Sequence, residues 1–364
     1  MRIAQVAPLY ESVPPRLYGG TERVVSSLTE ELVRRGHEVT LFASGDSITS
    51  AHLVPVIETA IRLDPRVADP YAHTIRQVGI VARSAEQFDI IHCHIDYFPL
   101  VALPFLKTPV VTTLHGRLDL PDLPAVYREF PEALFISISN SQRQPLAWLN
   151  WIATVYNGID IEDFTFQPSP GSYLAFLGRI APEKKLDWAI EVAKRVGIRL
   201  VIAAKVDKVD RQYFETEIKH LLDDPLIEYI GEIDQKAKDS FLGGALATLF
   251  PIDWPEPFGL IMTESMATGT PVIARPCGSV PEVLVDGKTG FFCDTIDDMV
   301  QAVRRVDQID RANCRRHVEQ HFTTQRMVDG YEAAYKECVE RGRSAKLATA
   351  VSSPAPADQP LGDK

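Results

Sequence analysis

The sequence predicts an α/β protein made of two Rossmann-like domains. Short apolar runs of strand length alternate with segments of helical periodicity, which is the order typical of parallel sheets covered by helices. At 364 residues the chain is too long for one compact core and fits two domains of ordinary size. A stretch containing Pro168, Pro170 and Gly171 separates the two halves and provides the expected linker.

Composition and charge narrow the class of protein. The formal net charge is −11, which argues against binding to nucleic acid or an anionic membrane, because either function needs clustered Lys and Arg. The five cysteines contain no C-x-x-C pair, so we expect neither a structural zinc site nor a disulfide framework. The first apolar run is too short for a signal peptide, and none is long enough to span a bilayer. We therefore expect a cytoplasmic protein without a transmembrane segment, with at most weak peripheral membrane contact.

The chain begins with an apolar run, a glycine-rich loop and a helical pattern. Residues 3–7 have the length of a buried strand, Gly19 and Gly20 follow in the loop, and residues 21–36 have helical periodicity. Paired glycines let a backbone approach a ligand closely and present N–H groups at a helix start. An ordinary tight turn is the alternative for such a pair. The dinucleotide fingerprint G-x-G-x-x-G is absent, which counts against a dehydrogenase.

The rest of the first half continues the alternation of strands and helices. Residues 44–70 carry no pattern that we can assign to either. The expected strands are residues 39–43, 89–94, 110–114 and 133–139, and the expected helix is residues 71–87.

Three histidines lie on or after these strands. His92 and His94 point to the same face of one strand, because side chains alternate along it. A metal pair is conceivable, but no third ligand is spaced nearby, so structural or pocket-lining roles are favoured. His115 follows the next strand at its carboxyl end, where α/β folds bind ligands and where it could hydrogen-bond a ligand or move a proton. A loop histidine without a role is the alternative.

The second half opens with a strand at residues 173–177, then a basic turn. Arg179 and Lys184 lie five positions apart before a helix expected at residues 186–196. An arginine grips two phosphate oxygens at once and a lysine acts as a point charge, so the pair can converge on one pyrophosphate. A solvated turn is the alternative. Lys205 follows the next strand and could add a further charge, although a solvated lysine is equally consistent.

Two glutamates surround the start of a later helix. Prolines on both sides keep Glu256 on a loop, and Glu264 falls about one turn into the helix expected at residues 260–268. Both carboxylates can face the crevice at the carboxyl end of a parallel sheet. A solvated Glu256 and a helix-terminal charge at Glu264 are the alternatives.

The free backbone N–H groups at this helix start form the third element of the candidate site. Those of Phe258, Gly259 and Leu260 could hold an anion or a ring of hydroxyls. The remaining expected strands are residues 200–204, 227–230 and 245–250, and the remaining helices are residues 297–320 and 323–339.

These motifs resemble those of retaining glycosyltransferases of the GT-B fold, specifically glycosyltransferase family 4 (glycosyl transferases group 1). The resemblance covers about residues 1–340. It rests on Glu256-Pro-Phe-Gly-x4-Glu264 with the Gly-Thr-Pro-Val-Ile-Ala that follows, and on Gly-Arg179-x4-Lys184. Lys185 and Ser279 stand where the family usually has glycine.

The resemblance implies a GT-B architecture, in which two Rossmann-like domains face each other across a cleft. It places the amino-terminal acceptor domain at residues 1–160 and the sugar-nucleotide donor domain at residues 161–322. Residues 323–343 would form a helix that crosses back onto the first domain. Residues 344–364 are expected to be disordered, because Ser, Ala, Pro and Asp dominate them.

The resemblance also implies an activity and roles for the candidate residues. A hexosyl group would move from a UDP- or GDP-linked donor to a hydroxyl of a glycan, a lipid-linked acceptor or a small molecule, with retention of configuration. Arg179 and Lys184 would neutralise the leaving diphosphate. Glu256 would hold hydroxyls of the donor sugar, Glu264 would bind the ribose, and His115 would lie against the donor sugar. The loop of Gly19 and Gly20 would face the donor pyrophosphate and the acceptor, and is counted among the donor-binding residues.

No cofactor is expected, and metal ligands are assigned to no residue. The sequence lacks a metal-binding D-x-D triplet in its motifs, so positive side chains would replace magnesium and activity should persist in chelator. A sugar-nucleotide 2-epimerase of the same fold is one alternative. The other is a non-catalytic nucleotide-sugar-binding subunit, which would usually have lost an equivalent of Arg179, Lys184 or Glu256.

Overall fold

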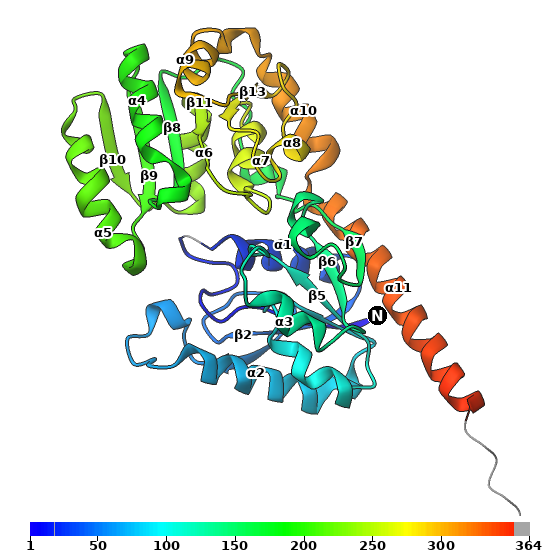
Figure 1. Cartoon of the computed structure of the whole chain (residues 1–364). Coiled ribbons are helices and arrows are strands. Elements are labelled where there is room, and N and C mark those ends of the chain that lie inside the picture. The colour runs from blue at the N-terminus through cyan, green and yellow to red at the C-terminus, as the bar shows by residue number, and fades with distance from the viewer. Residues whose placement is uncertain (18, 353–364) are drawn as a thin grey trace, which may run out of the picture.

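The computed structural model describes residues 1–17 and 19–352, and the side chains of all of these up to residue 342. Within these residues there are two parallel β-sheets, each covered by helices, and a long final helix that runs from the second domain along the first (Figure 1). The α/β class and the arrangement of two Rossmann-like domains are therefore confirmed. Within the same part of the chain, no helix is long and apolar enough to cross a bilayer.

The first sheet has the strand order β3-β2-β1-β4-β5-β6-β7. Its strands are β1 (Arg2–Val6), β2 (Glu38–Ser44), β3 (His52–Ile57), β4 (Ile90–Cys93), β5 (Val110–Leu114), β6 (Leu134–Ser137) and β7 (Trp151–Thr154). Its helices are α1 (Gly20–Arg34), α2 (Pro70–Ser84) and α3 (Leu123–Arg128), with short turns η1 (Ile61–Leu63), η2 (Ala85–Gln87), η3 (Phe98–Phe105), η4 (Ser141–Leu146) and η5 (Ile161–Asp163).

The second sheet has the strand order β10-β9-β8-β11-β12-β13. Its strands are β8 (Tyr173–Arg179), β9 (Leu200–Lys205), β10 (Ile227–Gly231), β11 (Ala245–Phe250), β12 (Val272–Ala274) and β13 (Gly290–Phe292). Its helices are α4 (Leu186–Val196), α5 (Arg211–Tyr213), α6 (Gln235–Gly243), α7 (Leu260–Ala267), α8 (Val280–Val283), α9 (Ile296–Arg304) and α10 (Arg311–His321), with short segments η6 (Pro182–Lys184), η7 (Lys208–Asp210), η8 (Phe214–Ile218), η9 (Lys219–Asp223) and η10 (Val306–Gln308).

Each strand expected from an apolar run is present, and the strands that the sequence did not predict are short or lie at an edge. The unassigned residues 44–70 contain β3, which is the edge strand of the first sheet and is mostly exposed or half-buried. Strands β12 and β13 have three residues each, which is too few to show a period of two. Their place is fixed by strand pairing, not by a local pattern: β12 pairs with β11, and β13 pairs with β12.

The final helix, α11 (Thr324–Ser352), belongs to the core of the first domain. Its residues Met327, Val328, Tyr331 and Tyr335 pack in one buried cluster with residues of the first sheet and α1. This confirms the crossing back that the family resemblance implied. The helix was expected to end at residue 343, and that end was wrong.

Residues 344–352 continue α11 in place of the expected disordered segment. Ala345, Lys346, Leu347 and Ala348 are good helix formers, and that local preference prevails over the low-complexity composition of the tail. The rest of the expected disordered tail, residues 353–364, lies outside the described part of the chain.

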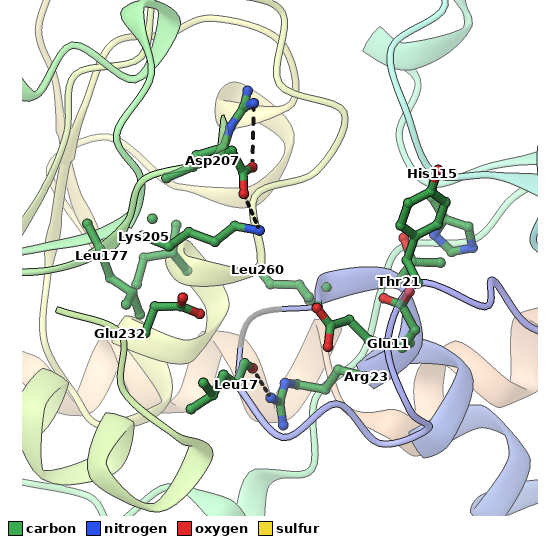
Figure 2. A pocket seen from close by; sticks show the side chains of 18 of the residues that line it. Glu11, Leu17, Thr21, Arg23, His115, Leu177, Lys205, Asp207, Glu232 and Leu260 are labelled. Carbon is green, nitrogen blue, oxygen red and sulfur yellow. Dashed lines mark hydrogen bonds and ion pairs between the residues drawn. The ribbon is translucent and has the colours of Figure 1, made fainter. Parts of the chain in front are cut away.

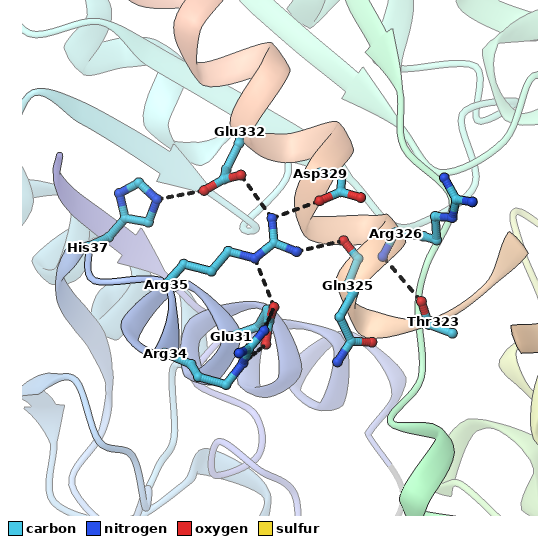
Figure 3. Close-up of polar contacts among 9 residues, drawn as sticks. All are labelled: Glu31, Arg34, Arg35, His37, Thr323, Gln325, Arg326, Asp329 and Glu332. Atoms are coloured by element: carbon cyan, nitrogen blue, oxygen red, sulfur yellow. Dashed lines mark hydrogen bonds and ion pairs between the residues drawn. The ribbon is translucent and has the colours of Figure 1, made fainter. Parts of the chain in front are cut away.

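Arg35, just after α1, fastens α11 to the first domain (Figure 3). Its guanidinium lies 2.8 Å from a Glu31 oxygen, 2.8 Å from Asp329 and 2.9 Å from Glu332, and it donates to the carbonyl of Gln325 at 3.0 Å. The Arg35 side chain is only 19% exposed, so these contacts are less screened than those of a surface ion pair. Helix α11 therefore stays with the first domain.

The two chain segments that cross between the domains lie side by side. Ile159 donates its N–H to the carbonyl of Phe322 at 2.9 Å, and its own carbonyl accepts from Thr324 at 3.0 Å. A methyl group on Gly158 would lie 2.3 Å from the carbonyl oxygen of Thr323, so only glycine allows this approach. The linker and the start of α11 are thus hydrogen-bonded to each other.

Candidate active site

A cavity of about 1220 Å³ lies between the two domains, at the carboxyl ends of the strands in both sheets. Figure 2 shows Lys205 and Asp207 on the wall from the second domain, facing Glu11 and His115 on the wall from the first. Every residue to which the family resemblance assigned a catalytic or donor-binding role lines this cavity. They are Gly19, Gly20, His115, Arg179, Lys184, Lys205, Glu256, Phe258, Gly259, Leu260 and Glu264.

Lys184 and Glu256 form an ion pair in this cavity. The two side chains are 13% and 14% exposed, and the indole N–H of Trp254 donates to the same Glu256 oxygen at 2.8 Å. The Lys184 ammonium also lies 4.9 Å from the centre of the Trp254 ring and 5.9 Å from that of Phe250. Two aromatic faces and one carboxylate thus hold this cation in place.

The structure shows which of the two neighbouring lysines, Lys184 or Lys185, lines the cavity, and the sequence alone did not. Lys185 has φ 52° in the left-handed region, where glycine is normally favoured, and it precedes α4. Its ammonium lies 4.0 Å from Asp253. Of the two lysines, Lys184 lines the cavity.

Arg179, the last residue of β8, is surrounded by carboxylates. Its guanidinium lies 3.0 Å from Asp210 and 3.9 Å from Asp207, and it pairs with Glu183. Asp207 in turn lies 3.0 Å from the ammonium of Lys205 (Figure 2). These acids pair with the basic groups of this wall, so an anionic ligand would compete with them for Arg179 and Lys205. Acidic residues in a loop carry no sequence signal, and our sequence analysis missed them.

Gly259 fixes the start of α7. Its φ is 77°, and a methyl group there would lie 2.9 Å from Met262 and 3.2 Å from the ring of Phe250. The Phe258 side chain is buried and packs edge-on against Phe322 with ring centres 5.9 Å apart. Only the backbone of these residues therefore faces a ligand, as anion binding at a helix N-terminus requires.

A second loop supports Glu256 from behind. Ser279 donates its N–H to the Glu256 carbonyl at 3.0 Å and its hydroxyl to the Phe258 carbonyl at 2.8 Å. The serine that replaces the usual glycine therefore fastens the loop. Next to it, Gly278 has φ 63° and leaves no room for a methyl group.

Glu264 lies in the first turns of α7 with its carboxylate almost fully buried. The ammonium of Lys238, from α6, lies 2.6 Å from one of its oxygens. A carboxylate has about four lone-pair positions, so Glu264 retains capacity to accept hydrogen bonds from hydroxyl groups. Lys238 also lines the cavity and was missed by the sequence analysis.

The glycine loop of the first domain meets the start of α7. A methyl group on Gly20 would lie 3.6 Å from the side chain of Leu260, and one on Gly19 would lie 2.7 Å from Pro15. A side chain at the first residue of α1 would thus touch the first residue of α7. The two expected helix starts face the same cavity from opposite domains.

His115 is held by a second histidine. Its Nε2 lies 2.9 Å from Nδ1 of His94, and Nε2 of His94 lies 2.9 Å from Oε1 of Gln5. Burial lowers the pKa of His115 to about 3, so the ring is neutral at physiological pH. His92 is hydrogen-bonded as well, to Tyr335 and Thr113.

Both ring nitrogens of His92 and of His94 are within hydrogen-bond distance of other side chains. Within the described residues, no group of three or more His, Cys, Asp or Glu side chains is placed to hold a metal ion. Both rings are buried and hydrogen-bonded, which fits the structural role that was one of the two favoured by the sequence.

Two buried glutamates on the first-domain wall were also missed. Glu22, which follows the glycine pair by two residues, is 6% exposed, and burial raises its pKa to about 7. Glu11 pairs with Arg62, whose guanidinium lies 3.5 Å from Glu232 of the second domain. The sequence offered one indication that Glu22 lies at the cavity, which is its position two residues after the pair Gly19 and Gly20.

Two protein-family models match the chain, one in each half. The model of "Glycosyltransferase Family 4" matches residues 18–163, and that of "Glycosyl transferases group 1" matches residues 160–320. A phosphatidyl-myo-inositol mannosyltransferase of Mycolicibacterium smegmatis is 26% identical over 339 residues, covering 83% of this chain and 84% of that protein. A glycogen synthase of Mycobacterium tuberculosis is 26% identical over 362 residues, covering 84% and 86%.

Solved structures share the fold over nearly the whole chain. The glycosyltransferase AviGT4 of avilamycin A biosynthesis has a TM-score of 0.72 at 21% identity and covers 93% of this chain and 98% of its own. A sucrose-phosphate synthase from Thermosynechococcus elongatus has a TM-score of 0.72 at 18% identity, covering 97% and 100%. Anabaena HepE in complex with UDP and glucose has a TM-score of 0.72 at 16% identity, covering 93% and 100%.

Proposed function

Because the chain belongs to the GT-B glycosyltransferases of family 4, group 1, we propose that it transfers a hexosyl group from a UDP- or GDP-linked sugar with retention of configuration. The acceptor would be a hydroxyl of a glycan, a glycolipid or a small molecule. A fold neighbour that binds UDP and glucose supports the proposed class of donor.

The observation that carries this proposal is the convergence of opposite charges on one interdomain cavity. Arg179, Lys184 and the N-terminus of α7 supply positive charge, while Glu256 and Glu264 supply carboxylates on the same wall. A nucleoside-diphosphate sugar needs both. Its diphosphate requires cations or N–H donors, and its sugar and ribose hydroxyls require acceptors.

The proposed chemistry follows from how the anomeric bond breaks. Cleavage of the bond between the anomeric carbon and the diphosphate oxygen leaves positive charge on the sugar ring and negative charge on the diphosphate. Lys184 would exchange Glu256 for a phosphate oxygen, and Arg179 would join it. The released Glu256 would then accept hydroxyls of the sugar and stabilise the cationic ring.

Retention would come from attack on the face that the diphosphate leaves. The acceptor oxygen bonds to the anomeric carbon as the diphosphate oxygen departs, and the acceptor proton passes to that departing oxygen. Glu264 would bind the ribose and His115 the donor sugar. We infer that Arg179 and Lys184 perform the charge neutralisation that a metal ion performs elsewhere, so the reaction would not need one.

A donor panel tests the proposal. Purified protein is incubated in chelator with UDP- and GDP-linked glucose, galactose, mannose and N-acetylglucosamine, and products are followed by mass spectrometry and NMR. We expect slow hydrolysis of one donor with release of its nucleoside diphosphate, lost in Glu256→Gln. Conversion into another sugar nucleotide without release would indicate a 2-epimerase instead, and donor binding that no acceptor converts into turnover would indicate a non-catalytic subunit.

A further inference from the structure

A continuous chain of hydrogen bonds runs from His115 at the cavity to the C-terminal helix. His115 Nε2 lies 2.9 Å from His94 Nδ1, and His94 Nε2 lies 2.9 Å from Oε1 of Gln5 on β1. The Gln5 amide N–H donates to the Tyr335 hydroxyl at 2.9 Å. His94, Gln5 and Tyr335 are buried, so water does not compete for these bonds.

The chain continues beyond Tyr335. The Tyr335 hydroxyl lies 2.7 Å from Nδ1 of His92, and His92 Nε2 lies 2.7 Å from Oγ1 of Thr113. A phenol is a strong donor and a neutral imidazole nitrogen a good acceptor, so the short O···N bond is best made by the Tyr335 proton. Since the hydroxyl has only one proton, it must accept from Gln5.

This fixes the direction of every bond toward the cavity. The amide nitrogen of Gln5 donates a hydrogen bond to Tyr335, and the amide oxygen of Gln5 faces His94. An amide oxygen can only accept a hydrogen bond. His94 therefore carries its proton on Nε2. Burial keeps the His94 ring neutral, so its Nδ1 has a lone pair and accepts from His115 Nε2–H.

We propose that Tyr335 is a positioning residue for His115. Acting through Gln5 and His94, it holds the His115 proton on Nε2 and leaves Nδ1 as a hydrogen-bond acceptor for a hydroxyl of the donor sugar. The part that concerns the sugar rests on the proposed function. The part that concerns the proton does not.

Helix α11, which crosses from the second domain to the first, would then have a role beyond packing. Arg35 fastens α11 to α1 two turns from its start (Figure 3). Tyr335 lies further along the same helix. Helix α11, which enters from the second domain, would thus determine which ring nitrogen of His115 carries the proton. Without the Tyr335 hydroxyl, the Gln5 amide could rotate by half a turn and reverse each bond.

The first test observes the proton directly in the unliganded full-length protein. Histidine ¹⁵N-labelled protein is studied by long-range ¹H–¹⁵N correlation NMR, with His115 assigned by substitution. We expect the Nε2–H form of His115 in the wild type and a mixture of both tautomers in Tyr335→Phe. A proton on His115 Nδ1 in the wild type, or an unchanged His115 in a folded Tyr335→Phe, would overturn the proposal.

Tyr331→Phe is the matched control. Tyr331 lies one turn earlier on α11, is equally buried and has its ring 4.9 Å from that of His92. Its hydroxyl approaches Thr113, at the far end of the chain beyond His92, and is not a partner of Gln5, His94 or His115. Its removal should leave the His115 signals in place. Should Tyr335→Phe fail to fold, Gln5→Met removes the bridging amide at similar volume and is expected to give the same mixture.

The second test uses steady-state kinetics to distinguish a positioning role of Tyr335 from a purely structural one. For the best donor, Tyr335→Phe should lower kcat about tenfold, the size usual for a partner that orients an active-site ligand, with donor KM changed less than twofold. Tyr331→Phe should retain the wild-type kcat. A mixed tautomer with wild-type kcat would overturn the role toward the sugar. Absence of turnover in the wild type would refute the proposed function, while the NMR result would still decide the position of the proton.

Discussion

Gly278 lies directly against the backbone of Glu256. A methyl group on residue 278 would be 2.3 Å from the Glu256 nitrogen and 2.5 Å from its carbonyl oxygen, closer than atoms can approach. The loop that presents the Glu256 carboxylate to the cavity is therefore positioned by the absence of a side chain on a neighbouring turn.

Gly278→Ala should displace the Glu256 loop while the protein remains folded. We expect kcat to fall by at least about tenfold, because a shift of the order of 1 Å in a positioned group is costly. Gly287→Ala is the control, since that residue also has a left-handed φ, 71°, but no atom within 4 Å of the added methyl group. Equal kcat losses in both variants would contradict the role of Gly278.

Lys184→Ala and Lys185→Ala should differ sharply. Lys184 lines the cavity, and in the proposed reaction its ammonium would face the departing diphosphate, so we expect kcat of Lys184→Ala to fall about a hundredfold. Lys185→Ala should change it less than about twofold. In addition, Lys185→Gly should raise the free energy of unfolding by about 1 kcal/mol, because φ 52° suits glycine. Steady-state kinetics and urea unfolding measure these effects, and a larger kinetic loss at Lys185 would reverse the assignment.

Arg179→Ala should reduce catalytic efficiency about a hundredfold, because it would remove a fixed charge from the proposed diphosphate site. The comparison is Arg195→Ala, on the outer surface of α4, where the arginine pairs with Asp297. That variant should behave as the wild type in the same assay. Unchanged efficiency in Arg179→Ala would refute the diphosphate site.

Glu22→Gln should change how stability depends on pH. The folded pKa of Glu22 is raised to about 7 from 4.5 by burial, with Glu11 raising it further and Lys205 opposing this. The folded state therefore binds more protons than the unfolded state between these values, so this group destabilises the protein as pH rises through the window. We expect the variant to gain about 2 kcal/mol over the wild type between pH 5 and pH 8.

Urea unfolding at several pH values measures this gain. The control is Glu86→Gln, whose side chain is 80% exposed and should show no such trend. If the free energy of unfolding depended on pH in the same way in Glu22→Gln and in the wild type, the raised pKa of Glu22 would be contradicted.

The sequence predicted what is encoded locally. Strands such as β5 and β9 are continuous apolar runs, and the two-glutamate motif of α7 lies within one loop and one helix, so neighbouring residues reveal both. The choice between Lys184 and Lys185 was different. It depends on a backbone angle at residue 185 that composition does not specify.

Long-range contacts explain what the sequence could not predict. Gln5 and Tyr335 touch across 330 positions of the chain, and neither belongs to a motif. Asp207 and Asp210 are ordinary loop acids until β8 brings Arg179 beside them. Such contacts follow from the packing of complete domains, which no short pattern contains.

The paired crossings at Ile159 and Thr323 also constrain motion. Because the two crossing segments are hydrogen-bonded to each other, they would move together, so we expect any rotation of one domain against the other to be centred near Ile159 and Thr323. The cavity walls would then approach each other along one arc. In such a motion, Arg179 on one wall and His115 on the other would approach a molecule held between the domains from opposite sides.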